Sequence, residues 1–189
     1  RAQPGANSTA RRLKAAGMTP VVMPLLQLRP LNLSQEHQEL LANFTGELIF
    51  TSANGVKFAP ISLTQKVGTV WCVGDATAEA ARRVGFEQVV SAKGSARELI
   101  DKIMAEHDPE HSQFIHLGHS EPRGSIAETL ASHGFQVTHV PLYTAAPTPD
   151  YAKRLNAAFS GDVRIDVVMI HSPASGKRFA DIWKRHGLD

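Results

Sequence analysis

AETLASHGFQVTHVPLY, residues 127–143, contains a structural unit that recurs through this sequence. A helical pattern ends at Gly134, and a run rich in valine follows at once. Glycine supplies the left-handed backbone conformation in which many helices end, and such an apolar run is typical of a buried parallel strand. The same unit occurs in ARRLKAAGMTPVVMPLLQL (10–28) and AEAARRVGFEQVVSA (78–92), so we predict a helix followed by a strand three times.

Further apolar runs lie between these units, and each stops at small or polar residues. They are ELIFTS (47–52), TVWCVG (69–74), QFIHLG (113–118) and DVVMIHS (166–172). Alternation of helix and strand favours the α/β class with parallel sheets. A fourth helical pattern reaches Gly187 with no strand after it, and no strand precedes the first helix. We therefore expect a first strand and a C-terminal portion of the fold outside this sequence.

A second repeat relates two distant segments, IFTSANGVKFA (49–59) and IHSPASGKRFA (170–180). Both contain an apolar run, a serine at its end, a lysine and a Phe-Ala pair, and Ser52 matches Ser172. Two similar halves in one chain predict two similar parallel-sheet domains that face each other across a cleft. Clefts between α/β domains are common ligand sites.

Prolines mark the expected domain boundaries. Residues 30–31 and 141–145 are predicted to be extended connectors, because proline disfavours helix in the residue before it. If the two connectors run side by side as a two-stranded hinge, residues 32–140 form one continuous domain. Residues 1–29 and 146–189 then form a second, discontinuous domain.

Composition narrows the function classes. Hydrophobic residues make up 42% of the chain, and no apolar run approaches the roughly 20 residues of a membrane span. The formal net charge is +2 with scattered basic residues, and 6% of residues are aromatic, which disfavours nucleic-acid binding. Cys72 is the single cysteine, so an internal disulfide is excluded and a cytoplasmic location is expected.

Hydroxyl residues follow two of the apolar runs. Thr51 or Ser52 is expected to cap the next helix, and Thr77 lies shortly after TVWCVG. Free N–H groups at such helix starts can bind anions. An ordinary helix cap remains an equally simple interpretation of each residue.

Two other side chains could act on a ligand. Arg123 lies in the loop LGHSEPRGS (117–125), where its guanidinium could pair with a carboxylate or remain solvated. Tyr143 lies in the return connector PLYTAAP, and its phenol could donate a proton or simply pack. Strict strand alternation would place Leu142 and Thr144 on the side opposite Tyr143.

Several familiar chemistries lack their motifs. The sequence contains neither a GxGxxG dinucleotide fingerprint nor a GxxxxGK[ST] phosphate loop. It also lacks a GxSxG nucleophile elbow. His116 and His119 have no accompanying ligand set for a metal, and Cys72 falls within an apolar run, where a free cysteine usually packs.

Taken in order, these segments resemble the uroporphyrinogen-III synthase family. The resemblance rests on AAGMTPVVMPLLQLRP (15–30), IFTSANGV (49–56), WCVGDATAEAARRVG (71–85), the loop at 117–125, GFQVTHVPLYTA (134–145) and VVMIHSPASGKRF (167–179). It covers nearly the whole chain. Arg1 resembles the arginine that ends the first strand of the family.

This resemblance implies an enzyme, a lyase that forms uroporphyrinogen III from hydroxymethylbilane without a metal or organic cofactor. The linear tetrapyrrole loses its terminal hydroxyl as water and closes through a spiro intermediate that inverts the last ring. The resemblance further implies a substrate with eight carboxylates, the preceding pathway enzyme as a partner, and a monomer. Tyr143 would correspond to the proton donor. Substrate-binding positions would be Arg1, Thr51, Ser52, Thr77, Arg123 and Ser172.

The sequence departs from the family pattern at two points. His171 stands where a threonine or an aromatic residue is common, and a second threonine motif, expected near position 197, lies beyond Asp189. Two alternatives remain open. The chain could be a two-lobed binding module that traps a small molecule without chemistry, or a non-catalytic scaffold domain.

Overall fold

The computed structural model describes residues 5–122, 124–160 and 164–186. The chain divides into two compact units. Unit 1 comprises Arg1–Arg29 with Ala145–Asp189, and unit 2 comprises Pro30–Thr144. Each unit is described separately below.

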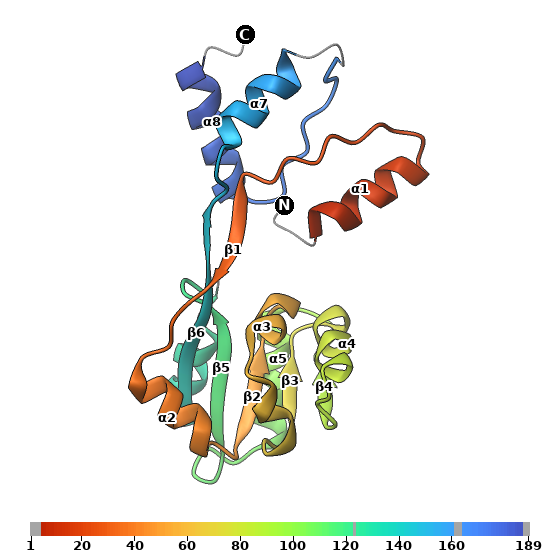
Figure 1. Ribbon diagram of the computed structural model, residues 1–189. Helices are drawn as coiled ribbons and strands as arrows, with labels where there is room; N and C mark the ends of the chain where they lie inside the picture. Colours follow the sequence, from red (N-terminus) through yellow and green to blue (C-terminus); the bar gives the residue numbers. More distant parts are fainter. Residues whose placement is uncertain (1–4, 123, 161–163, 187–189) are drawn as a thin grey trace. The chain divides into compact units, whose positions relative to one another are not determined.

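A mostly parallel sheet organises unit 2, although β1 and the end of β6 belong mainly to unit 1. Its strand order is β1-β6-β5-β2-β3-β4, and four neighbouring pairs from β6 to β4 are parallel (Figure 1). The predicted α/β class with a parallel sheet is therefore confirmed. The strands are β1 (Leu26–Pro30), β2 (Glu47–Phe50), β3 (Val70–Cys72), β4 (Val89–Ser91), β5 (Gln113–His119) and β6 (Gln136–Pro147).

Helices cover both faces of this sheet. Figure 1 draws α3 in front of the sheet and α5 behind it. The helices of unit 2 are α2 (Gln35–Asn43), α3 (Ala53–Phe58), the short 3₁₀ helix η1 (Ile61–Gln65), α4 (Asp75–Arg83), α5 (Ala96–Glu106) and α6 (Ile126–Ser132).

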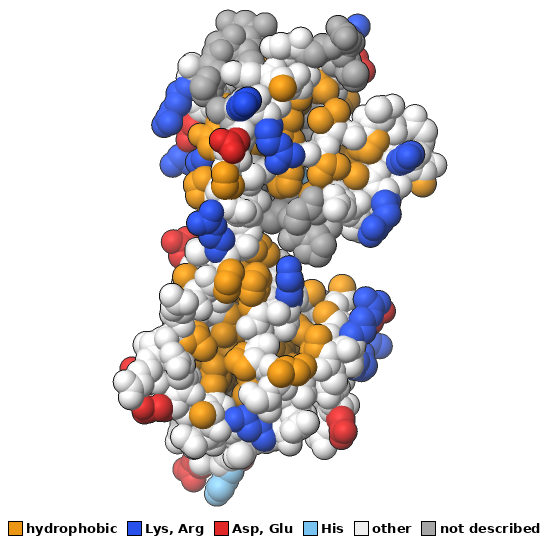
Figure 2. All heavy atoms as spheres, in the orientation of Figure 1, with side chains coloured by type: hydrophobic (Ala, Val, Ile, Leu, Met, Phe, Trp, Pro, Cys, Tyr) orange, Lys and Arg blue, Asp and Glu red, His pale blue; other side chains and the backbone are white. Residues whose placement is uncertain are grey.

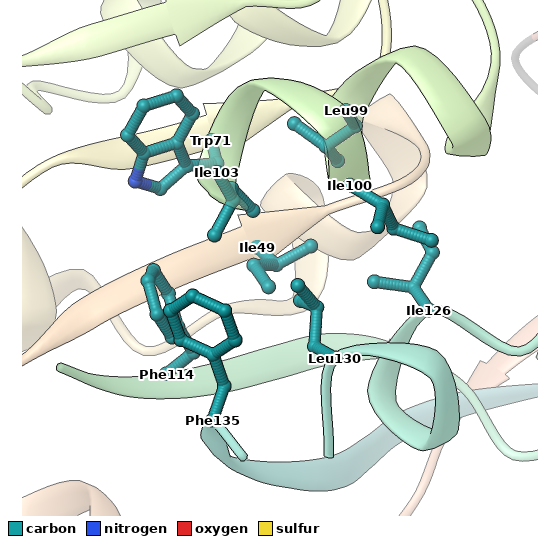
Figure 3. Close-up of a cluster of buried hydrophobic side chains, with 9 residues drawn as sticks. All are labelled: Ile49, Trp71, Leu99, Ile100, Ile103, Phe114, Ile126, Leu130 and Phe135. Carbon is teal, nitrogen blue, oxygen red and sulfur yellow. The ribbon is translucent and has the colours of Figure 1, made fainter. Parts of the chain in front are cut away.

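One hydrophobic core cluster of unit 2 lies between the sheet and the helices α5 and α6. Ile49, Trp71 and Phe114 project from three neighbouring strands toward Ile103 on α5 and Leu130 on α6 (Figure 3). All five side chains are at most 1% exposed. Burial of this apolar surface is the main force that holds the layers together.

Glycines end the helices where the sequence predicted. Gly17, Gly85 and Gly134 have φ values of 80°, 106° and 89°. These left-handed conformations would strain any residue with a Cβ atom. The fourth such glycine, Gly187, lies outside the described residues.

The two proline-containing connectors belong to paired strands. The Leu31 N–H donates to the Leu142 carbonyl at 2.9 Å, and the Thr148 N–H donates to the Leu25 carbonyl at 3.1 Å. The residue number on the first strand rises from 25 to 31 while that of its partner falls from 148 to 142, so the two strands run antiparallel. The strands are longer than the predicted connectors, because β1 begins at Leu26 and β6 extends over Gln136–Pro147.

The described residues of unit 1 include the helices α1 (Gly5–Ala15), α7 (Tyr151–Phe159) and α8 (Pro173–His186). Leu25, Leu155 and Ile182 form its small buried cluster. The strand predicted over 166–171 is wrong because these residues are irregular, and the run predicted over 18–28 is a strand only from Leu26 onward. An apolar run becomes a strand only when its backbone pairs with a neighbour, and within the described residues this pairing begins at β1.

One ion contact in unit 2 yields a stability prediction. The Lys66 ammonium donates to the carbonyls of Leu41 and Ala42 at 2.7 and 2.6 Å, at the C-terminal end of α2. A cation at this end also interacts favourably with the helix dipole. Lys66→Met keeps the apolar stem and removes these bonds, so we expect unit 2 to lose about 1–2 kcal/mol of unfolding free energy.

Urea unfolding measures this loss. Trp71 fluorescence reports on unit 2 once Trp183, the other tryptophan, is replaced by phenylalanine. Lys102→Met is the control, because Lys102 contacts Glu106 only at 4.0 Å across a helix surface. Such surface pairs contribute little. Equal losses in the two variants would contradict the capping role of Lys66.

Candidate functional site

The carboxyl edge of the unit 2 sheet places Ser52 at the start of α3. β2 ends at Phe50, and Ser52 follows as the N-cap residue with an extended backbone. Its hydroxyl accepts the Asn54 N–H at 3.2 Å. The capping role expected for Thr51 or Ser52 therefore belongs to Ser52. The same hydroxyl also lies close enough to the Tyr143 phenol to lower its pKa, so it is near both the helix start and a neighbouring strand.

Tyr143 is held by aromatic contacts as well as by Ser52. Its ring stacks on Phe58 with centroids 5.0 Å apart, and the His119 ring meets it edge to face at 5.3 Å. The side chain is 5% exposed. Burial raises the pKa of the Tyr143 phenol, and the nearby Ser52 hydroxyl opposes that rise. The phenol is thus protonated at neutral pH and can donate its proton.

A β-bulge sets the position of Tyr143, and the alternation predicted for this strand is wrong. Gly118 pairs with Pro141, but the next residue, His119, pairs with Tyr143 rather than with Leu142. The extra residue lies on β6, so Leu142 and Tyr143 are both buried, at 3% and 5% exposed. Bulges re-aim side chains in this way.

Thr51 contacts the buried His116, which lies beside the half-buried His139. Its Oγ1 lies 3.4 Å from Nε2 of His116, and the His116 ring lies 5.1 Å from the ring of His139. His116 is 2% exposed, and burial, together with nearby His139, lowers its pKa to about 4. His116 is therefore neutral near pH 7. From the sequence, His116 was considered only as a metal ligand, and no accompanying ligand set was found.

The buried His116 predicts a pH dependence of stability. The unfolded imidazole, with a pKa of 6.5, binds a proton in the window where the folded one, near 4, does not. Folding is therefore destabilised as the pH falls from about 6.5 toward 4, by up to roughly 1.4 kcal/mol per pH unit for one proton. His116→Gln should flatten this slope in urea titrations between pH 4.5 and 7. Identical slopes for both proteins would show that His116 does not titrate on unfolding.

Thr77 lies in the first turn of α4, after β3. It is 7% exposed, and its N–H donates to the Gly74 carbonyl at 3.0 Å. Gly74 is the N-cap residue of this helix, with no side-chain hydrogen bond to cap it. Thr77 and Ser52 follow neighbouring parallel strands, which places both at the same edge of the sheet.

Ser172 repeats the capping geometry in unit 1. Its hydroxyl accepts the Ser175 N–H at 3.2 Å and donates to the Ser175 hydroxyl at 3.0 Å, at the start of α8. The strand predicted before Ser172 is not formed, as described above. The predicted arginines Arg1 and Arg123 lie outside the described residues.

A cavity of about 750 Å³ lies within unit 1, and Tyr143 is not among the residues that line it. Its walls include Leu13, Met23 and Phe159. Figure 2 shows hydrophobic side chains at the surface of this unit. The exposed large apolar residues there are Met18, Val21, Val167, Val168, Met169 and Ile170. The chemistry proposed from the sequence does not depend on this apolar cavity.

The described part of the chain contains neither a metal-binding cluster nor an exposed thiol. No group of three or more His, Cys, Asp or Glu residues is arranged to hold a metal there. Burial raises the pKa of the Cys72 thiol to about 12, so this residue is a poor nucleophile. In addition, no described helix is long and apolar enough to cross a membrane.

Comparison with known sequences identifies a family. Residues 7–189 match the family described as uroporphyrinogen-III synthase HemD. A search of curated proteins gives no significant match.

Solved structures show a similar fold. A mutant uroporphyrinogen III synthase from Thermus thermophilus matches with a TM-score of 0.54 and 16% identity, over 82% of this chain and 64% of that chain. Uroporphyrinogen-III synthetase from Helicobacter pylori gives 0.58 and 16%, over 88% and 73%. The wild-type Thermus thermophilus enzyme gives 0.50 and 15%, over 98% and 76%. The chain thus spans 64% of the first of these proteins.

Proposed function

Because this chain belongs to the uroporphyrinogen-III synthase family, we propose that it closes hydroxymethylbilane to uroporphyrinogen III. The reaction releases water and inverts the last pyrrole ring. It requires a group that protonates the departing hydroxyl and a surface that holds a flexible polycarboxylate. Neither task requires a strong nucleophile, which agrees with the buried thiol of Cys72.

The observation that carries this proposal is the contact between Tyr143 and Ser52. Tyr143 donates its phenolic proton to the terminal hydroxyl of the substrate, the carbon–oxygen bond breaks, and water leaves. The pyrrole ring retains the positive charge, and the Ser52 hydroxyl stabilises the phenolate by a hydrogen bond. A raised pKa keeps the phenol protonated before the reaction.

The remaining hydroxyls are proposed to bind the substrate. Thr51, Ser52 and Thr77 lie at or just beyond the carboxyl edge of one sheet, where α/β proteins commonly bind ligands. Ser172 is proposed to serve the same purpose from unit 1, with Arg1 and Arg123 pairing with substrate carboxylates. Control of ring closure is then largely a problem of positioning.

The domain arrangement belongs to the same proposal. We propose two similar domains that face each other across a substrate cleft, hinged at β1 and β6. The matching caps at Ser52 and Ser172 support this idea, because each serine accepts an N–H group at the start of a helix. A monomer, and contact with the preceding enzyme of the pathway, are also proposed.

The rate of substrate consumption tests whether the protein is an enzyme. Freshly prepared hydroxymethylbilane is incubated with increasing amounts of the protein, and its disappearance is followed. A rate proportional to protein concentration, with many turnovers per chain, is expected. A binding module or scaffold would consume no more than the background rate, and that outcome would overturn the proposed activity.

A further inference from the structure

The turn after β5 contacts both the backbone and the ring of Tyr143. The Ser120 N–H donates to the Tyr143 carbonyl at 2.8 Å, and the Ser120 hydroxyl donates to the Thr144 hydroxyl at 3.0 Å. His119, the last residue of β5, pairs with Tyr143 across the bulge. The segment from His119 to Ser120 is therefore in position to control where Tyr143 lies.

His119 is itself fixed in two ways. Its Nδ1 accepts the Glu121 N–H at 2.9 Å, which places the proton of the neutral imidazole on Nε2. Its main chain is held by the strand pairing with Tyr143 across the bulge. Thus both the main chain and the ring orientation of His119 are set by neighbours within unit 2.

The Tyr143 ring lies against two rings of different orientation. Phe58 stacks on it with an interplanar angle of 23°, and the His119 ring is perpendicular to it at 90°. Stacked and edge-to-face pairs are both favourable, and each contributes beyond the burial of its area. A stacked neighbour alone would allow the tyrosine to slide in its own plane. A perpendicular ring restricts that movement.

We propose that His119 is a positioning residue for Tyr143. The His119 ring holds the Tyr143 ring against Phe58, with the Tyr143 phenol beside Ser52. The inference rests on the proposed function, because holding Tyr143 in place affects catalysis only if Tyr143 acts on the substrate. The placement of the tyrosine ring can be measured without any turnover. His119 itself transfers no proton in this role.

Two variants separate the aromatic contact from the hydrogen bond. His119→Asn keeps an acceptor near the Nδ1 position and removes the ring, whereas His119→Phe keeps a ring and removes the acceptor. We expect His119→Asn to lower kcat about ten- to a hundredfold with little change in KM, because misplaced reacting groups slow the chemical step. His119→Phe should stay within about threefold of the parent. His133→Asn, on the exposed C-cap of α6, is the control and should have no effect.

Nuclear magnetic resonance gives the readout that is independent of activity. In a Tyr151→Phe background Tyr143 is the only tyrosine, and its ring protons should show an Overhauser contact with Phe58. That contact should persist in His119→Phe and disappear in His119→Asn, at an unchanged unfolding midpoint. If His119→Asn unfolds, His119→Leu replaces it, since leucine also lacks the ring.

The two proposals fail in different ways. If the Tyr143–Phe58 contact persists in His119→Asn, the proposed role of His119 is wrong, whatever the activity. A parent protein that does not turn over hydroxymethylbilane overturns the proposed function, and the Overhauser contact still decides the role of His119.

Discussion

Replacing Tyr143 with phenylalanine is expected to lower turnover of hydroxymethylbilane by about two to four powers of ten, the range for loss of a general acid. The substitution removes one oxygen and keeps the ring, so the stacking on Phe58 and the edge contact with His119 remain. Binding should change little, and the loss should therefore appear in kcat rather than in KM.

The other tyrosine provides the control for this experiment. Tyr151 lies in unit 1, with the Arg178 guanidinium 4.2 Å from its ring centroid. Tyr151→Phe also removes one phenol but leaves the proposed site intact, so its turnover should equal that of the parent. If Tyr143→Phe retains a near-normal rate, Tyr143 only positions the substrate, and water or a substrate carboxylate supplies the proton.

A glycine inside α3 gives the second large effect. A Cβ atom on Gly55 would lie 2.8 Å from the Leu117 carbonyl oxygen and 3.0 Å from Cδ1 of Phe50. Alanine in a helix normally stabilises it by about 1 kcal/mol over glycine. Here overpacking against two strands costs roughly 1–3 kcal/mol, so we expect Gly55→Ala to be destabilising. The first turn of α3 must also move, which shifts Ser52 away from Tyr143 and lowers turnover.

Urea unfolding followed by Trp71 fluorescence measures the stability loss. Gly68→Ala is the matched control, because a Cβ atom there would meet its nearest neighbour, Cγ of Glu47, at an ordinary 3.5 Å. The control should be neutral or slightly stabilising, since alanine restricts the unfolded chain. A Gly55→Ala variant as stable as the control would show that α3 is not packed tightly against β5.

The fold of unit 2 could be predicted from local patterns. Gly85 and Gly134 each end a helix and precede a strand, because glycine adopts a positive φ without strain and a β-branched run favours the sheet. In unit 1 the same reasoning failed over residues 166–171. Val167 is 81% exposed there, because a strand depends on partners that no local pattern supplies.

The candidate site was only partly predictable. Ser52 and Tyr143 were each identified by their position after or within an apolar run, but their contact depends on strand order and on a bulge. Neither feature leaves a clear signal in one sequence. His116 and His119 were considered only as a metal pair, and Phe58 was noted only as part of the repeated Phe-Ala pair. Their roles depend on which rings the fold brings together.

Isomer analysis of the product tests the central claim most directly. The protein is incubated with freshly prepared hydroxymethylbilane, and the uroporphyrinogen that forms is identified. We predict the product with the last pyrrole ring inverted, uroporphyrinogen III, formed by the parent and greatly reduced in Tyr143→Phe. If the parent yields only the product with an uninverted last ring, the protein does not control ring closure, and the proposed synthase function is wrong.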